Sequence, residues 1–193
     1  MAAPGSYIVR LTANGKSSTQ PLTIKMDPRV KTPQAEMVRQ LEIASKLAES
    51  LGEVSAAMQQ ASELRKQIGA RRKESGQNAE LQQALEALEK KIEFLVETDS
   101  DAEFGLFGLA LPGEADPPLP KIATALSKLL TIVESADTAP TGDAATACEK
   151  WESSAPAGLG RWNELQKVDI AGTNASLQKA GFKPLKVEQA QKP

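Results

Sequence analysis

Three carboxylates at alternating positions are the residues of this sequence best suited to bind a cation. Asp99, Asp101 and Glu103 lie in the stretch DSDAE, and calcium-binding loops surround the ion with oxygen ligands from alternating acidic residues. The Phe104-Gly105 pair that follows provides neither the further ligands nor the spacing of such a loop. We therefore interpret DSDAE as a solvated acidic loop and predict no metal site.

This sequence lacks the side chains that most often carry out catalysis. There is no histidine, which is the commonest general acid or base and a frequent zinc ligand. Cys148 is the only cysteine, so neither an internal disulfide nor a cluster of metal-bound thiolates can form. No pair of acidic residues has a spacing that separates it from ordinary acids on a helix surface. We predict that this chain has no catalytic residue, holds no cofactor and is not an enzyme.

Charge and hydropathy argue against two classes of partner. The basic run RKQIGARRK at 65–73 is a candidate nucleic-acid contact, but the formal net charge of the chain is -2 and no aromatic residues interleave to stack on bases. The longest apolar run, FGLFGLALP, is about half the length that crosses a bilayer. We predict neither nucleic-acid binding nor membrane insertion. The opening MAAPGSYIVR has no signal-peptide pattern.

Two groups of large apolar residues are candidates for contact surfaces. Trp151 and Trp162 are expected to share one face of a helix. They would form either an exposed carbohydrate platform or, as we favour, part of the core. The side chains of FGLFGLAL either form an exposed contact surface or, as we favour, fold back over the open end of a helical bundle. The candidate interaction residues in this stretch are Phe104, Leu106, Phe107 and Leu109.

The N-terminal residues are predicted to form a β-hairpin. Residues 6–12 (SYIVRLT) alternate in polarity, residues 18–26 (STQPLTIKM) follow, and Asn14-Gly15 between them is a strong turn signal. Pro21 marks an edge position or the start of a strand. Because an isolated hairpin is only marginally stable in water, we expect this one to dock through an apolar face. The candidate contact residues on that face are Tyr7, Val9, Leu11, Leu22 and Ile24.

The rest of the chain has helical periodicity. Thr32 is the predicted N-cap of a long helix, whose apolar stripe ends before Gly76, and a second helix spans 78–96. A third helix begins at Asp116 or at Leu119.

A fourth helix begins near Thr141 in the same pattern. Pro156 is expected to kink or break it, with Val168 facing inward near its end. Asp169 is the predicted cap of a short last helix.

These elements predict a mainly α fold. An antiparallel up-down bundle of about four helices follows the short hairpin, which is expected to pack against one end or side of the bundle. We assign residues 1–30 to the hairpin, 31–185 to the bundle and 186–193 to a flexible tail.

The opening PGSYIVRLTANGKSSTQPLTIKMDPRV resembles a segment near the end of large bacterial proteins with sortilin-like, BNR-repeat β-propellers, often labelled glycosyl hydrolase-like. ESADTAPT at 134–141 and DIAGTNASLQKAGFKPL at 169–185 extend the resemblance. In that family an immunoglobulin-like sandwich follows the propellers, and a helical region follows the sandwich. The resemblance implies that residues 1–30 are a remnant of such a sandwich, with Asp27, Pro28 and Arg29 as the joint between strand and helix.

The same resemblance implies a function. Any glycan-related activity would lie in the propeller, which this sequence lacks, and the setting would be secreted or periplasmic. The leading hypothesis is a non-catalytic C-terminal helical module, whose partner is the rest of the parent polypeptide. The alternative is a free-standing helical interaction protein that oligomerises with itself through its long helix and its hairpin.

Overall fold

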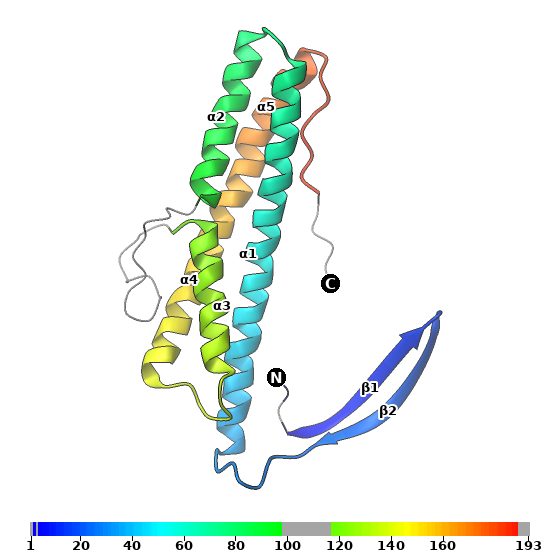
Figure 1. Ribbon diagram of the computed structural model, residues 1–193, viewed down its shortest axis with the longest axis vertical. Helices are drawn as coiled ribbons and strands as arrows, with labels where there is room; N and C mark the ends of the chain where they lie inside the picture. The colour runs from blue at the N-terminus through cyan, green and yellow to red at the C-terminus, as the bar shows by residue number, and fades with distance from the viewer. Residues whose placement is uncertain (1, 3, 98–116, 189–193) are drawn as a thin grey trace.

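Four main helices and an N-terminal hairpin make up the fold, which confirms the predicted fold class (Figure 1). The computed structural model describes residues 2, 4–97 and 117–188. The main helices are α1 (Gln34–Glu74), α2 (Ala79–Val96), α3 (Leu119–Val133) and α4 (Gly142–Leu165). A π-helical turn, η1 (Gln166–Ile170), joins α4 to the short α5 (Ala171–Lys179). The hairpin strands are β1 (Gly5–Ala13) and β2 (Lys16–Ile24).

The longest helix organises the bundle. α1 has 41 residues, a length of about 60 Å at 1.5 Å per residue. α2 packs along its C-terminal half and α3 along its N-terminal half, so α2 and α3 follow one another along α1 (Figure 1). α4, η1 and α5 then run antiparallel to both of them. The bundle is therefore antiparallel, with two of its four main helices sharing one side of α1.

The core is a continuous cluster of mainly aliphatic side chains, with two tryptophans, on the inner faces of the helices. The residues that α2 buries recur every three or four positions along one face: Leu81, Leu85, Leu88, Ile92 and Leu95. The large residues that α3 buries are Leu119, Ile122, Leu126, Leu129 and Val133. Full burial of one such side chain is worth about 1.5–3 kcal/mol. The bundle therefore contains a core of its own.

A buried glutamine fixes the position of α3 against α1. Gln40 is completely buried, and its Nε2 donates hydrogen bonds to the backbone carbonyls of Val133 and, at 2.7 Å, of Ala136. The last carbonyls of a helix lack partners within the helix itself. The predicted stripe on α1 omits Gln40 because a polar residue carries no apolar signal, and only its partner helix explains its burial.

The start of α1 differs from the prediction. The helix begins at Gln34, with Pro33 as its N-cap residue and no side-chain cap. The Thr32 hydroxyl donates instead to the Asp137 carbonyl at 2.6 Å. The predicted Thr32 cap is therefore wrong, because a contact with the turn after α3 uses this hydroxyl.

Of the kink or break predicted at Pro156, the break is wrong. α4 continues through this proline, which lies on the exposed side of the helix. A proline leaves the carbonyl one turn earlier without its donor, and on the exposed side of a helix water is close enough to solvate that carbonyl.

The π-helical turn corrects two further predictions. Asp169 lies inside η1 and caps no helix, and Val168 is 62% exposed instead of facing inward. The next buried residue after Leu165 is Ile170, at the i+5 spacing of a π-helix. The wider turn shifts the buried face by one to two residues, and a search for steps of three and four does not detect this shift.

The segment after α5 lies along α1. Gln67 exchanges two hydrogen bonds of 2.9 Å with the Lys186 backbone, and the Gln60 amide donates to the Glu188 carbonyl at 2.9 Å. The Arg71 guanidinium donates to the Lys183 carbonyl at 2.8 Å. Residues 186–188 are thus attached to the bundle instead of belonging to the predicted flexible tail, and 189–193 lie outside the described residues.

Candidate interaction surface

The hairpin owes its form to a two-residue turn. Asn14 and Gly15 have φ values of 50° and 74°, which is the left-handed pair that a type I′ turn requires. This turn matches the right-handed twist of the two strands, so Ala13 pairs directly with Lys16. The predicted hairpin and its turn are confirmed.

The register of the strands collects the apolar residues on one face. Tyr7 pairs with Leu22, Val9 with Gln20 and Leu11 with Ser18. Paired residues point to the same face, and successive residues along a strand point to opposite faces. Tyr7, Val9, Leu11, Leu22 and Ile24 therefore share one face with the polar Ser18 and Gln20, whereas Ile8 lies on the other face. We call the surface formed by these five apolar residues the hairpin face.

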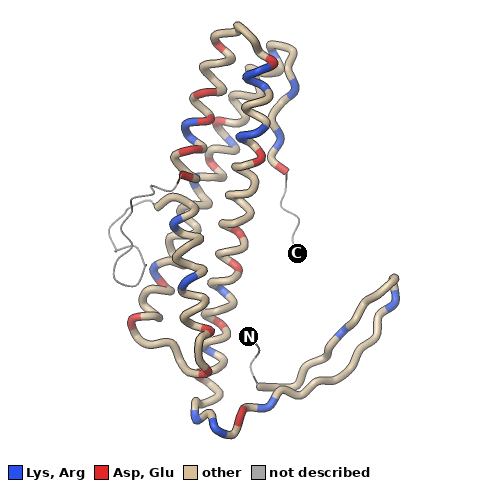
Figure 2. The backbone as a smooth tube through the Cα atoms, viewed as in Figure 1, with Lys and Arg blue, Asp and Glu red and all other residues tan. Residues whose placement is uncertain are grey.

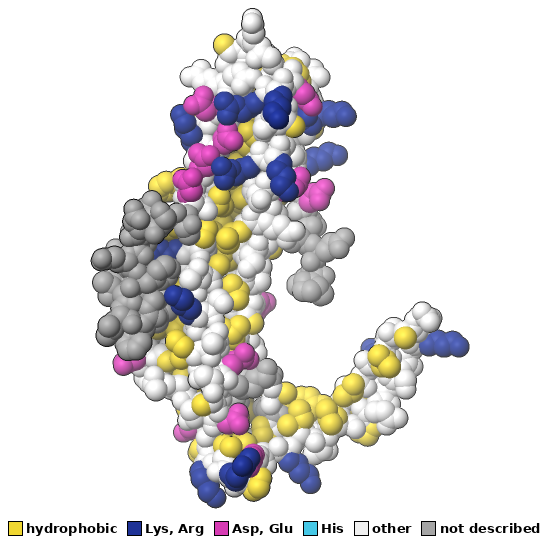
Figure 3. Space-filling view, viewed as in Figure 1, with side chains coloured by type: hydrophobic (Ala, Val, Ile, Leu, Met, Phe, Trp, Pro, Cys, Tyr) yellow, Lys and Arg dark blue, Asp and Glu magenta, His cyan; other side chains and the backbone are white. Residues whose placement is uncertain are grey.

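The hairpin face is not covered by the helices. Val9 is 50% and Leu11 69% exposed, and the hairpin extends away from the bundle (Figures 1 and 3). Among the described residues, the strands pack on each other and not on the helices. The expected docking of the hairpin on the bundle is wrong. The bundle helices already bury their apolar stripes against one another, so the core of the bundle does not need the hairpin.

A short turn joins the hairpin to α1. The Asp27 carboxylate accepts hydrogen bonds from the Arg29 backbone N–H at 2.9 Å and from Arg29 Nη2 at 2.6 Å. These bonds favour the charged form and lower the pKa of Asp27 below its usual range. The residues that the resemblance marks as a joint thus form a turn between strand and helix, with the Val30 N–H closing it on the Asp27 carbonyl at 3.0 Å.

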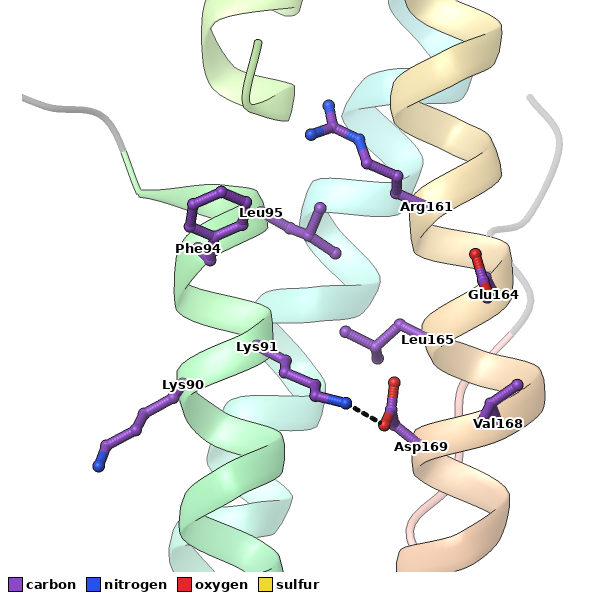
Figure 4. Close-up of a pocket in the computed structure, with 9 residues that line it drawn as sticks. All are labelled: Lys90, Lys91, Phe94, Leu95, Arg161, Glu164, Leu165, Val168 and Asp169. Carbon is purple, nitrogen blue, oxygen red and sulfur yellow. Dashed lines mark hydrogen bonds and ion pairs between the residues drawn. The ribbon is translucent and has the colours of Figure 1, made fainter. Parts of the chain in front are cut away.

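A groove of about 510 Å³ lies between α2 and the α4–η1 segment (Figure 4). The exposed Phe94 and Val168 come from opposite walls of the groove, and the buried Leu165 lies between them (Figure 4). Val168 was predicted to face inward, and Phe94 was not predicted as a surface residue. The only sequence signal for Phe94 is that a large apolar residue lies off the buried face of its helix.

The charged groups of this groove serve the fold. Lys91 Nζ lies 2.6 Å from Asp169 Oδ1 across the groove, and Lys90 pairs with Glu86 at 2.8 Å. Arg161 Nη2 donates to the Pro117 carbonyl. The Lys91–Asp169 pair thus ties α2 to η1, whereas the Lys90–Glu86 pair lies within α2.

The other sequence candidates serve the fold where the structure describes them. Trp151 and Trp162 are both buried, and Trp162 Nε1 donates to Gln60 Oε1 at 3.0 Å, so the pair is core rather than an exposed platform. Burial, together with the nearby charges of Glu152 and Glu149, raises the pKa of the Cys148 thiol.

The basic run at 65–73 is engaged within the bundle. Arg65 and Arg72 form ion pairs with Glu93 and Glu89 of α2, at 2.9 and 2.6 Å. The run therefore joins α1 to α2, and its guanidinium groups face acidic partners instead of an open surface.

The remaining sequence candidates lie in the undescribed loop. Asp99, Asp101 and Glu103, and the residues Phe104, Leu106, Phe107 and Leu109, are outside the described residues. Over 2, 4–97 and 117–188 there is no group of three acidic or cysteine side chains that could hold a metal ion. No described helix is both long and apolar enough to span a bilayer.

Comparisons with known proteins give no family for this chain. No protein-family model, no curated protein and no solved structure matches it.

Proposed function

We propose that this chain is a non-catalytic helical module that attaches to another folded domain through its N-terminal hairpin. The observation that carries the proposal is the hairpin face, whose five apolar side chains lie on a two-stranded sheet without a core. A hairpin of this kind is marginally stable in water and gains most from a surface that covers it. Each large apolar side chain contributes about 1.5–3 kcal/mol when it is fully buried, so a few of them hold a domain interface.

The attached domain belongs, on this proposal, to the same polypeptide. The resemblance of the N-terminal stretch to bacterial sortilin-like, BNR-repeat propeller proteins makes the chain the C-terminal part of a larger exported protein, secreted or periplasmic. The absence of histidine supports a role without catalysis in this chain. The self-contained core of the bundle supports a terminal module that folds beside its neighbour.

The alternative is an interaction protein that oligomerises with itself. The same uncovered hairpin supports it, because strands exchanged between two copies would complete a sheet. Light scattering separates the two functions: a dimer that persists on dilution favours the alternative, and a monomer favours the proposed module.

The first experiment is the intact mass of the native polypeptide, detected in its source cells with an antibody raised against the bundle. The proposed function expects a band several-fold heavier than the 20.5 kDa of this chain. A native band at 20.5 kDa would contradict a module of a larger protein. In that case the self-association test decides whether the alternative replaces it.

A further inference from the structure

The two edges of the hairpin differ in their hydrogen-bonding capacity. In a hairpin with a two-residue turn, the pair that flanks the turn exchanges both backbone hydrogen bonds, and hydrogen-bonded and open pairs then alternate along the strands. Ala13–Lys16 is the flanking pair, so Leu11–Ser18, Val9–Gln20 and Tyr7–Leu22 are also hydrogen-bonded pairs. The intervening residues direct their backbone groups away from the hairpin.

One side-chain contact agrees with this alternation. Thr12 and Ser17 form an intervening pair, and their hydroxyl oxygens lie 2.8 Å apart. Open pairs bring their side chains closest together, which fits this short contact.

The outer edge of β1 is complete. Ser6, Ile8, Arg10 and Thr12 each direct one N–H and one C=O outward, and no described backbone group outside the hairpin bonds to them. β1 also lies on the side of the hairpin nearer to α1, and its residues are exposed (Figure 1). This edge offers an unbroken row of donors and acceptors to an added strand.

The outer edge of β2 is interrupted at its centre. Pro21 pairs with Ile8 in an open pair, so its backbone nitrogen faces outward. A proline has no N–H to donate and is confined to edge strands for that reason. An added strand on this side would lose a central hydrogen bond, whereas Pro21 disturbs nothing between β1 and β2.

We infer that the hairpin docks as the last two strands of another domain's β-sheet, with the edge of β1 hydrogen-bonded to that sheet and β2 left as its outer edge. This inference rests on the proposed function and specifies its geometry. One open edge, one blocked edge and one apolar face are the features of a hairpin at the margin of a larger sheet. The hairpin face then lies toward the core of the partner.

The charges of the hairpin define the partner strand further. Residues 5–24 contain two cations, Arg10 and Lys16, and no acidic residue (Figure 2). Arg10 points to the face opposite Val9, so the partner strand carries an acidic or neutral polar residue beside it. On the other face the partner strand is apolar at alternate positions, next to Val9 and Leu11.

A second copy of the chain fits this edge less well. Antiparallel pairing of two β1 strands about Arg10 would place two guanidinium groups directly opposite each other, and like charges in that position are destabilising. Pairing about Val9 avoids this clash. It would, however, join the two hairpin faces into one larger apolar surface, which no described part of either copy covers. The hairpin therefore matches the edge strand of a different domain better than it matches itself.

The test uses the full chain and a synthetic acetylated peptide, as long as β1, in which valine alternates with threonine or glutamate. NMR-detected hydrogen exchange reports the outward amides of both strands. With saturating peptide, exchange of the Ile8 and Arg10 amides is expected to slow by about tenfold, while the Thr19 and Thr23 amides are unchanged. No protection of the β1 amides would overturn the inference, and so would protection of the β2 amides instead.

Two matched proline variants identify the edge. Ile8→Pro removes an outward N–H from β1, and Thr19→Pro removes one from β2; neither removes a hydrogen bond between the strands. We expect Ile8→Pro to abolish peptide binding and Thr19→Pro to retain it. The Tyr7–Leu22 cross-strand contact, measured by NMR in both variants, establishes that the hairpin is intact. Loss of binding only in Thr19→Pro, or in neither variant, would overturn the inference.

Failure of the inference is distinguishable from failure of the proposed function. If Val9→Asp abolishes peptide binding and Ile8→Pro does not, the hairpin attaches through its face and the edge assignment is wrong. If the β1 amides become protected as the chain itself is concentrated, without peptide, the partner is a second copy and the inference is overturned. The intact mass of the native polypeptide tests the proposed function independently of both results.

Discussion

The bundle and the hairpin use the same kind of apolar residue with opposite results. Leu126 in α3 is completely buried, whereas Leu11 in β1 is 69% exposed. Both belong to a regular apolar pattern, with helical spacing in one case and alternation in the other. The helical stripes bury one another because several of them face a common axis, and the stripe of the hairpin has no counterpart among the described residues. A whole apolar face that stays uncovered indicates a binding partner more strongly than a single exposed leucine does.

The largest effect is expected from the core of the bundle. Trp162→Ala removes a buried indole and leaves a cavity, so we expect a loss of about 3–5 kcal/mol in the free energy of unfolding. Urea denaturation followed by far-UV circular dichroism measures it. Trp162→Phe is the matched control, because it keeps most of the packing and loses mainly the hydrogen bond to Gln60. A loss below that of Trp162→Phe would contradict the assignment of this residue to the core.

Two glycines of α4 sharpen the comparison within the bundle. A Cβ at Gly158 would lie 2.7 Å from Ile122 Cδ1 and 3.1 Å from Leu119 Cδ2, whereas one at Gly160 would meet nothing within 4 Å. We expect Gly158→Ala to destabilise the bundle by about 1–3 kcal/mol through overpacking. Gly160→Ala is expected to stabilise it by about 0.5–1 kcal/mol, since alanine restricts the unfolded chain. A Gly158→Ala variant as stable as Gly160→Ala in urea denaturation would refute the close approach of α4 to α3.

The hairpin is expected to leave the stability of the bundle unchanged. Val9→Asp alters the centre of the hairpin face, yet the free energy of unfolding of the bundle should stay within about 0.5 kcal/mol, as it does for surface substitutions. The same denaturation experiment, with the unfolding of the helices as its signal, measures this. A loss of more than 1 kcal/mol, the size expected of core damage, would mean that the hairpin packs on the bundle in solution.

The smallest effect concerns the turn that joins the two regions. The pKa of Asp27 is lowered by its bonds from Arg29, so the charged carboxylate stabilises the turn above the ordinary pKa of 3.8. This contribution is lost as the pH falls through the lower pKa of the folded chain. Since both side chains are exposed, the midpoint of bundle unfolding should not follow this titration. An NMR titration of Asp27 measures the pKa, which Arg29→Gln should raise; an identical pKa in that variant would show that the pair does not form.

The predicted elements are correct where they depend on neighbouring residues. The errors occur where a side chain bonds to a residue far along the chain. The Asn14-Gly15 turn sets the register of the hairpin, and the regular spacing in α2 identifies its buried face. Thr32 is a good cap by type, but the Asp137 carbonyl, far along the chain, takes its hydroxyl. Gln40 has no apolar signal, and only the end of α3 explains its burial.

The candidate surface was partly predictable for the same reason. Alternation placed the five residues of the hairpin face together, and the proline at 21 indicated an edge. That no described helix covers the face became visible only in the folded chain. The groove beside Phe94 was not predicted. Its other exposed apolar residue, Val168, faces outward because of a π-helical turn, and such a turn has no periodic pattern in the sequence.

By itself the sequence determined the two strands, the four main helices, the register of the hairpin and the absence of histidine chemistry. These properties depend on neighbours a few residues away or on composition alone. The tertiary structure decided that α2 and α3 follow one another along α1, that η1 shifts the buried face by its i+5 step, and that the hairpin remains uncovered. Each of these depends on which apolar faces meet across long stretches of chain, and the packing of whole helices settles that, because burial is a property of pairs of surfaces.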